Sequence, residues 1–441
     1  MTQAQVCRPV RLRVDPLLRN GHVLTVGSLM TSAFGAGYWA LATRWYGDAT
    51  VGRTYAAVSA MMLLSGLGQL GLANVLVRFL PQPGADRRGL IQTAYAAACG
   101  ATLVAVLGFL ALIPLCAPGL GFLRAPAAGG CFVATTVAYA LFALQDGALT
   151  GLRRPGLVVG KNSGFAIAKI AFVAALAAPL PTLGILLSWT LALVATLITV
   201  DARLFARLLP EHDRAEAVAA AEAPIRAGFA TRFRPGRAVV RYAGADYLGT
   251  LCWLAATTLP PIIVLEQAGA RESAYFSLAW VVANTLYLVG LNMGASLLVE
   301  AAGGTAGLGA GCRRVLRHTG ALLALAITAL VAGAPLVLRV FGPGYARNGS
   351  TLLQLLALSA LPHLVVATAI SACRVLGRMR VVVAIQAGLA AAVLGLTVAL
   401  LPLLGVLGAG VAWLGAQTAT ALALLAARRS WLPTTPGRSP A

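Results

Sequence analysis

The sequence predicts an all-α integral membrane protein with about twelve transmembrane helices in two six-helix bundles. Three observations lead to this fold class: an apolar composition, a series of long apolar runs, and basic residues that fall between those runs. The chain has 441 residues, of which 59% are hydrophobic and 11% charged, with a mean hydropathy of +0.83. Soluble domains carry about 25% charged residues, so lipid is the expected solvent.

Each apolar run is long enough to span a membrane. Crossing about 30 Å of hydrocarbon takes about 20 residues of helix, and a helix satisfies its own backbone hydrogen bonds in lipid. The runs lie at 21–43, 55–80, 90–115, 128–150, 156–179, 181–201, 238–264, 274–299, 318–340, 351–373, 381–401 and 405–427. The first run is too long for the apolar core of a cleaved signal peptide, so we assign it as the first span.

The basic residues predict the orientation. Cytoplasmic segments of membrane proteins are enriched in Lys and Arg. With the N-terminus in the cytoplasm, most of the 34 Lys and Arg residues fall on the cytoplasmic side. The expected external loops hold only Arg44, Arg53, Arg124, Arg271, Arg339 and Arg347. The sequence therefore predicts a multi-pass membrane protein with both chain ends in the cytoplasm, and the excess of 32 Arg over 2 Lys, with abundant Ala, Gly and Leu, suggests a bacterial cell membrane.

The runs divide into two sets of six around one long polar connection. We expect a basic N-terminus over 1–20, a first bundle over 21–201, a cytoplasmic linker over 202–237, a second bundle over 238–427 and a tail over 428–441.

The two bundles show weak internal similarity. Leu180-Pro181 precedes the sixth run as Leu401-Pro402 precedes the twelfth, and Trp189 and Trp413 follow them. An even number of spans in each repeat gives both bundles the same orientation, related by a pseudo-two-fold axis along the membrane normal. Substrate sites of such transporters lie near the midplane, between the repeats.

Charged side chains inside the runs are the first candidates for function, because burying a charge in lipid is costly. Lys169 lies midway along the fifth run, and Lys161 and Asn162 precede it by about two turns. Asp146 lies near the cytoplasmic end of the fourth run. Runs four and five are antiparallel neighbours, so Asp146 and Lys161 lie at similar depth, where they either fix helix register or bind substrate.

The remaining candidates come from the second, seventh and eighth runs. Asp246 is a candidate proton or cation site, or a partner for Arg78, which ends the second run. Asn74, Asn284 and Tyr287 add polar character, although Asn in a span often only binds a neighbouring helix. These side chains complete a candidate substrate cavity.

Several other classes of site are excluded or disfavoured. The formal net charge of +21 does not indicate nucleic-acid binding, because the arginines are dispersed between the apolar runs. The segment from Gly156 to Ser163 is one residue too short for a phosphate loop, so no ATP site is expected. The four histidines are scattered and suggest no metal site, and no other cofactor is expected.

Two segments resemble a known family. The segment YAAVSAMMLLSGLGQLGLANVLVRFLP from Tyr55 and the segment LQDGALTGLRRPGLVVGKNSGFAIAK from Leu144 resemble polysaccharide flippases. These belong to the multidrug, oligosaccharidyl-lipid and polysaccharide (MOP) exporter superfamily. The resemblance covers essentially the whole chain and implies twelve spans, two bundles and alternating access.

The resemblance implies a flippase for a lipid-linked oligosaccharide or polysaccharide precursor, coupled to a proton, a cation or the membrane potential. Cell-envelope pathways such as lipopolysaccharide synthesis use such flippases, so glycosyltransferases or a polymerase are expected partners. A multidrug or cation antiporter of the same superfamily is the alternative, which Asp146 and Asp246 keep open. An enzyme such as a membrane glycosyltransferase or polymerase is disfavoured, because the external loops are short and hold few acids.

Overall fold

The computed structural model describes residues 16–82, 84, 86–214, 237–301 and 307–431. Every regular element within these ranges is helical, which confirms the all-α fold class. Most of the expected linker, at 215–236, lies outside the described residues, as do residues 1–15 and 432–441.

The N-terminal half comprises the helices that precede the linker. In chain order they are α1 (Pro16–Trp45), α2 (Asp48–Gly68), α3 (Leu72–Phe79), α4 (Arg87–Cys116), the 3-10 helix η1 (Pro118–Arg124), α5 (Pro126–Gly151), α6 (Pro155–Leu176), α7 (Gly184–Arg203) and the π-helix η2 (Leu204–Leu208).

The C-terminal half follows the linker. It comprises α9 (Arg237–Ala268), α10 (Ala270–Ala301), α11 (Leu308–Arg339), α12 (Pro343–Leu358), α13 (Ala360–Val375), α14 (Met379–Leu404), α15 (Val406–Ala426) and the short α16 (Arg428–Trp431).

Ten described helices are long and apolar enough to cross a membrane, or eleven when the bent pair α2 and α3 is counted as one span. The expected first span, α1, is long enough but is not among them, because its Gly, Ser, Thr and Tyr residues lower its hydropathy. α1 packs against α6 of its own half and against α10 of the other. Small residues suit this position, since they let helices approach closely in lipid.

The expected second span, 55–80, is interrupted. α2 and α3 meet at an angle of 51° across a break at residues 69–71. Leu70 and Gly71 both have positive φ, at 51° and 70°, a conformation that ends an α-helix. A run of apolar residues does not reveal this break, which divides the span near its linker side.

The sixth span is longer than expected. We predicted that it ends at residue 201, whereas the helix continues through η2 to Arg214. Leu204 and Leu209 are buried in a small cluster with Leu76 and Leu80 of the α3 region. Apolar packing beyond residue 201 therefore extends the helix into the segment that we assigned to the linker.

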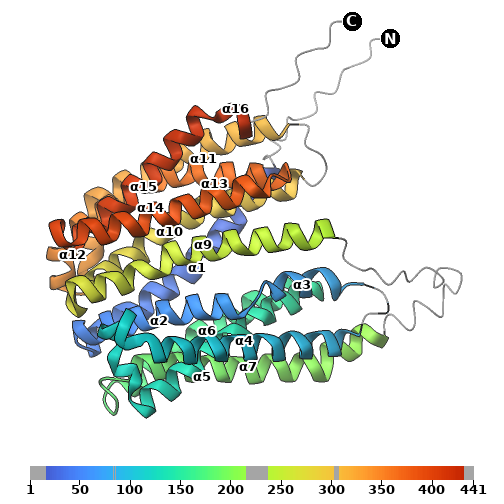
Figure 1. The fold of residues 1–441 in the computed structure, drawn as a ribbon, viewed down its shortest axis with the longest axis horizontal. Coiled ribbons are helices and arrows are strands. Elements are labelled where there is room, and N and C mark those ends of the chain that lie inside the picture. Colours follow the sequence, from blue (N-terminus) through green and yellow to red (C-terminus); the bar gives the residue numbers. More distant parts are fainter. Residues whose placement is uncertain (1–15, 83, 85, 215–236, 302–306, 432–441) are drawn as a thin grey trace, which may run out of the picture.

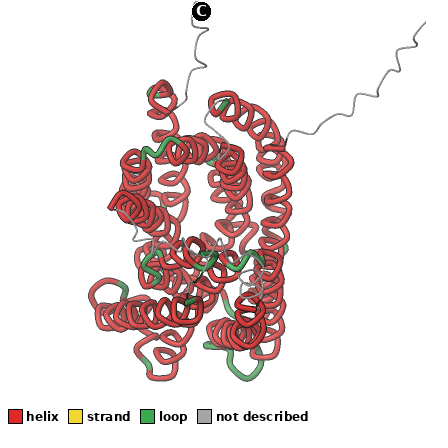
Figure 2. The backbone as a smooth tube through the Cα atoms, turned by 90° about the vertical axis from the view of Figure 1, so that its right-hand side faces the viewer, coloured by secondary structure: helices red, strands yellow, loops and turns green. Residues whose placement is uncertain are grey.

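The helices of the two halves converge at one end of the molecule and diverge toward the other (Figure 1). We call the end with η1 and the α9–α10 turn the turn end, and the end where α7 finishes and α9 begins the linker end. Figure 2 views the molecule from the linker end, where an upper and a lower set of helices adjoin one another.

At the turn end, carboxylates join the halves. Glu266 of α9 accepts hydrogen bonds from the Gly119 backbone amide at 3.0 and 2.9 Å, and Tyr345 of α12 donates to Asp48 at 3.0 Å.

Candidate functional site

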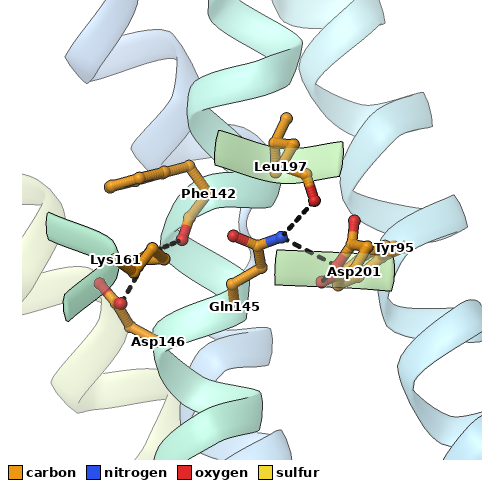
Figure 3. A network of polar contacts seen from close by, with 7 residues as sticks. All are labelled: Tyr95, Phe142, Gln145, Asp146, Lys161, Leu197 and Asp201. Atoms are coloured by element: carbon orange, nitrogen blue, oxygen red, sulfur yellow. Dashed lines mark hydrogen bonds and ion pairs between the residues drawn. The ribbon is translucent and has the colours of Figure 1, made fainter. Parts of the chain in front are cut away.

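Lys161 and Asp146 form an ion pair between α6 and α5 (Figure 3). The Lys161 ammonium lies 2.7 Å from Asp146 Oδ1, donates to the Phe142 carbonyl at 2.5 Å, and sits 3.4 Å from the centre of the Phe142 ring. The Lys161 side chain is fully buried, whereas that of Asp146 is 39% exposed. The antiparallel neighbours thus bring together two of the charges singled out in the sequence.

A second polar cluster lies close to this pair and includes a carboxylate that sequence analysis missed. Gln145 on α5 donates to Asp201 Oδ1 on α7 at 2.8 Å, and Tyr95 on α4 donates to the same oxygen at 3.0 Å (Figure 3). Asp201 is the last residue of the predicted sixth span, so we did not count it among the charges inside the membrane. The two clusters link α4, α5, α6 and α7 near the linker end.

Lys169 lies in an aromatic cage. Its ammonium is 4.1 Å from the Trp189 ring centre, 4.4 Å from that of Tyr38 and 5.2 Å from that of Phe165. The residue is 7% exposed, and within the described part of the chain it has no hydrogen bond or ion pair. Attraction between an ammonium and ring faces, worth about 2 kcal/mol when desolvated, takes the place of a carboxylate partner.

The cage depends on three helices. Tyr38 comes from α1, Phe165 and Lys169 lie one turn apart on α6, and Trp189 comes from α7. Tyr38 is fixed by a 2.9 Å hydrogen bond to Ser188 Oγ, next to Trp189 in sequence. The N-terminal half therefore holds a cation among aromatic rings in the interior of a membrane-spanning helix, α6.

Asp246 is paired with a different partner from the one we considered. Its Oδ1 lies 3.1 Å from Arg374 on α13, within the C-terminal half. Arg78 is exposed on α3, beyond the break in the second span. The hypothesis of an Asp246–Arg78 pair is therefore wrong, because α9 and α13 carry the paired side chains within one half.

The neutral candidates are dispersed. Asn162 is half-buried beside Lys161, Asn74 is exposed on α3, and Asn284 is half-buried on α10. Tyr287 is 1% exposed, and its hydroxyl donates to the Leu356 carbonyl at 2.7 Å. Tyr287 thus belongs to the interior of the C-terminal half.

That interior contains an aromatic cluster around a histidine that we had set aside. His363 on α13 is 2% exposed, with its ring centre 5.3 Å from Trp253 and 5.1 Å from Tyr287. Neither ring nitrogen makes a hydrogen bond of good geometry with the described residues, and nor does either amide atom of buried Gln417. Scattered positions in the sequence gave no sign of this arrangement.

The repeated tryptophans have matching surroundings. Trp189 on α7 and Trp413 on α15 are both buried among aromatic rings. The cation Lys169 belongs to the first cluster, and the second contains His363. Within the described residues no three His, Cys, Asp or Glu side chains are grouped as metal ligands.

Comparison with known proteins relates the chain to a transporter fold. No protein-family model and no curated protein sequence matches it. Among solved structures it is similar to an inward-facing multidrug resistance MATE family transporter of the MOP superfamily, with a TM-score of 0.67 and 13% identity over 92% of this chain and 98% of that one.

Two further structures widen the comparison. A MOP superfamily transporter from Pyrococcus furiosus, for which a reversed polarity of the binding pocket is reported to suggest a different function, gives a TM-score of 0.62 at 12% identity over 95% of this chain and 96% of that one. An outward-facing multidrug resistance MATE family transporter gives 0.59 at 13% identity over 97% and 98%. The chain therefore has the fold of the MATE transporters of the MOP superfamily.

Proposed function

We propose that this protein moves a lipid-linked oligosaccharide or polysaccharide precursor from the cytoplasmic to the outer leaflet by alternating access, in cell-envelope polysaccharide synthesis. The observation that carries the proposal is the buried Lys169 ammonium, held by aromatic rings and unpaired with any carboxylate in the described chain. Partner glycosyltransferases or a polymerase belong to the same proposal.

The argument rests on the charge of the substrate. A polyprenyl diphosphate brings negative charge into the protein, and a buried ammonium stabilises a phosphate through charge-assisted hydrogen bonds. A lysine already paired with a carboxylate would have to lose that partner first, at a cost of several kcal/mol in a desolvated site. Lys169 has no such partner to lose.

The carboxylates weigh against the alternative, a multidrug or cation antiporter. Such a transporter needs a carboxylate that is free to bind a cation or a proton. Asp146 is paired with Lys161 and Asp246 with Arg374, whereas Asp201 accepts hydrogen bonds only from neutral groups among the described residues and keeps this alternative open. The reversed polarity of the binding pocket that is reported for the Pyrococcus furiosus neighbour supports a different function on this fold.

The conformation suits uptake from the cytoplasm. If the linker end is cytoplasmic, as the arginines predict, the halves diverge on the side where the precursor is made (Figure 1). The TM-score is higher with the inward-facing relative, 0.67, than with the outward-facing one, 0.59.

The test is depletion of the protein in its host, followed by mass spectrometry of polyprenyl-linked sugars. Accumulation of one saccharide lipid is expected, with rescue by the wild type. Lys169→Arg keeps the charge and should rescue in part, whereas Lys169→Met should not rescue although it fills similar space. Arg347→Gln, an exposed change at the turn end, serves as the matched control and should rescue fully.

Two outcomes contradict the proposal. Unchanged saccharide lipids together with increased sensitivity to cationic drugs would favour the multidrug transporter. Full rescue by Lys169→Met would remove Lys169 from the mechanism.

A further inference from the structure

A groove runs along the flank of the N-terminal half between α6 and α7. Its volume is about 350 Å³. Gly160, Gly164 and Ala168 line one side at intervals of one helical turn, and Thr199 and Arg203 line the other. No lining residue comes from α1, α2, α9 or α10, the helices that join the halves, so the groove opens on the flank of the protein and not between the halves.

The groove is apolar along its length and basic at one end. Its walls are mainly small or aliphatic side chains. The two basic residues, Lys161 and Arg203, lie toward the linker end, where α6 begins and α7 finishes. Lys161 is already paired with Asp146. Arg203 is exposed, and among the described residues its guanidinium has no hydrogen bond or ion pair.

We propose that this groove binds an acyl chain of an anionic glycerophospholipid from the cytoplasmic leaflet, with the lipid phosphate on Arg203. The groove is apolar and has one unpaired guanidinium at its end, just as such a lipid has an apolar acyl chain and one anionic headgroup. Arg binds phosphate through two parallel N–H donors, which adds geometric selectivity to charge.

The length of the groove favours a phospholipid over a polyprenyl chain. Gly160 to Ala168 spans eight residues, or about 12 Å of helix. One leaflet of hydrocarbon is about 15 Å deep, half of the usual core. The groove thus covers most of one leaflet, whereas a polyprenyl chain longer than a leaflet would extend beyond it.

The π-helix η2 is a second feature of this site. It begins directly after Arg203, and its last residue, Leu208, lines the groove. Single π turns within α-helices recur at functional sites. Here the wider turn brings an aliphatic side chain of the same helix to the basic end of the groove.

The headgroup should determine selectivity. A lipid tail gains little on moving from the bilayer into an equally apolar groove. One arginine near an anionic headgroup is worth about 1 kcal/mol, which corresponds to about a fivefold preference. This inference concerns a lipid ligand on the flank and does not depend on which substrate the transporter carries.

The test is native mass spectrometry of the full-length protein, released from nanodiscs that contain equal amounts of phosphatidylglycerol and phosphatidylcholine. The wild type should retain phosphatidylglycerol about fivefold over phosphatidylcholine, the preference expected from one arginine. Arg203→Gln should abolish this preference. Gly164→Leu should lower retention of both lipids, because a Cβ at Gly164 meets no other atom within 4 Å and the side chain would occupy the groove.

Matched controls are Arg317→Gln on α11 and Gly108→Leu on α4, which are exposed changes of the same kinds away from the groove. Equal retention of the two lipids by the wild type would overturn the inference. So would an equal loss of preference in Arg203→Gln and Arg317→Gln. Displacement of phosphatidylglycerol by added polyprenyl phosphate, dependent on Arg203, would assign the groove to a prenyl lipid instead.

Discussion

Removing Asp146 should destabilise the protein more than removing Lys161, although the two residues form one ion pair. The Lys161 side chain is fully buried, so Asp146→Asn leaves a desolvated ammonium without its counter-charge. Breaking a buried pair in this way costs about 3–5 kcal/mol. The cost here should be nearer 2–3 kcal/mol, roughly, since Asp146 is 39% exposed and the Phe142 carbonyl and ring remain as partners.

The reverse change leaves a much smaller defect. Lys161→Met fills the same space with an apolar side chain, and the remaining carboxylate still reaches solvent. We expect a cost of about 1 kcal/mol or less, and a similar cost for the double variant, because it no longer buries a charge. The coupling energy of the double-mutant cycle should therefore be about 2 kcal/mol.

The assay is equilibrium unfolding in mixed micelles, with all four proteins of the cycle compared under the same conditions. Arg154 and Glu211 provide a control pair, 3.9 Å apart with side chains 54% and 57% exposed. An exposed pair of this kind should show a coupling energy below about 0.5 kcal/mol. If Lys161→Met costs as much as Asp146→Asn, or the two effects simply add, the burial argument is wrong.

Three further changes test other contacts. Glu266→Gln weakens the charge-assisted bonds from the Gly119 amide. The ratio of molecules with a separated turn end to those with a joined one, measured from spin-label distances across that end, should therefore rise about tenfold. Unchanged distances would contradict this. Tyr247→Phe removes the 2.7 Å hydrogen bond to the Leu67 carbonyl, so amides next to the α2–α3 break should exchange faster by a factor of about five. His363→Phe should change stability by less than about 1 kcal/mol, because it removes two buried nitrogens that make no hydrogen bond of good geometry with the described residues, and it keeps a ring in the cluster. A large loss would show that the imidazole binds a polar ligand.

Apolar runs predicted most of the spans, because lipid imposes the same requirement on every crossing helix. They did not predict the break at Leu70 and Gly71, since left-handed backbone angles leave hydropathy unchanged. Nor did they predict that α7 continues past residue 201, because that extension depends on packing of Leu204 and Leu209 with residues distant in sequence.

The candidate site was predictable only where topology alone fixed the neighbours. Asp146 and Lys161 lie on consecutive antiparallel helices near the same turn, so their depth could be derived from the sequence. Asp246 and Arg374 lie on α9 and α13, which are not consecutive, and no sequence spacing determines which helices of a bundle touch. His363 was missed because a neutral imidazole in a span is much less costly to bury than a charge, so the sequence does not mark it as a functional candidate.

The internal repeat ties these observations together. Trp189 and Trp413 occupy matching helices, and each is surrounded by rings, yet a cation is held only in the first of these two clusters. Packing accounts for a tryptophan at both positions, since each fills a buried interior lined by aromatic rings. Packing does not require a lysine in one cluster and a histidine in the other, because an apolar side chain could fill the space of Lys169 or of His363 among the rings. If the N-terminal half binds the diphosphate as proposed, that asymmetry predicts that a change of charge at Lys169 lowers substrate transport more than a change at His363 does.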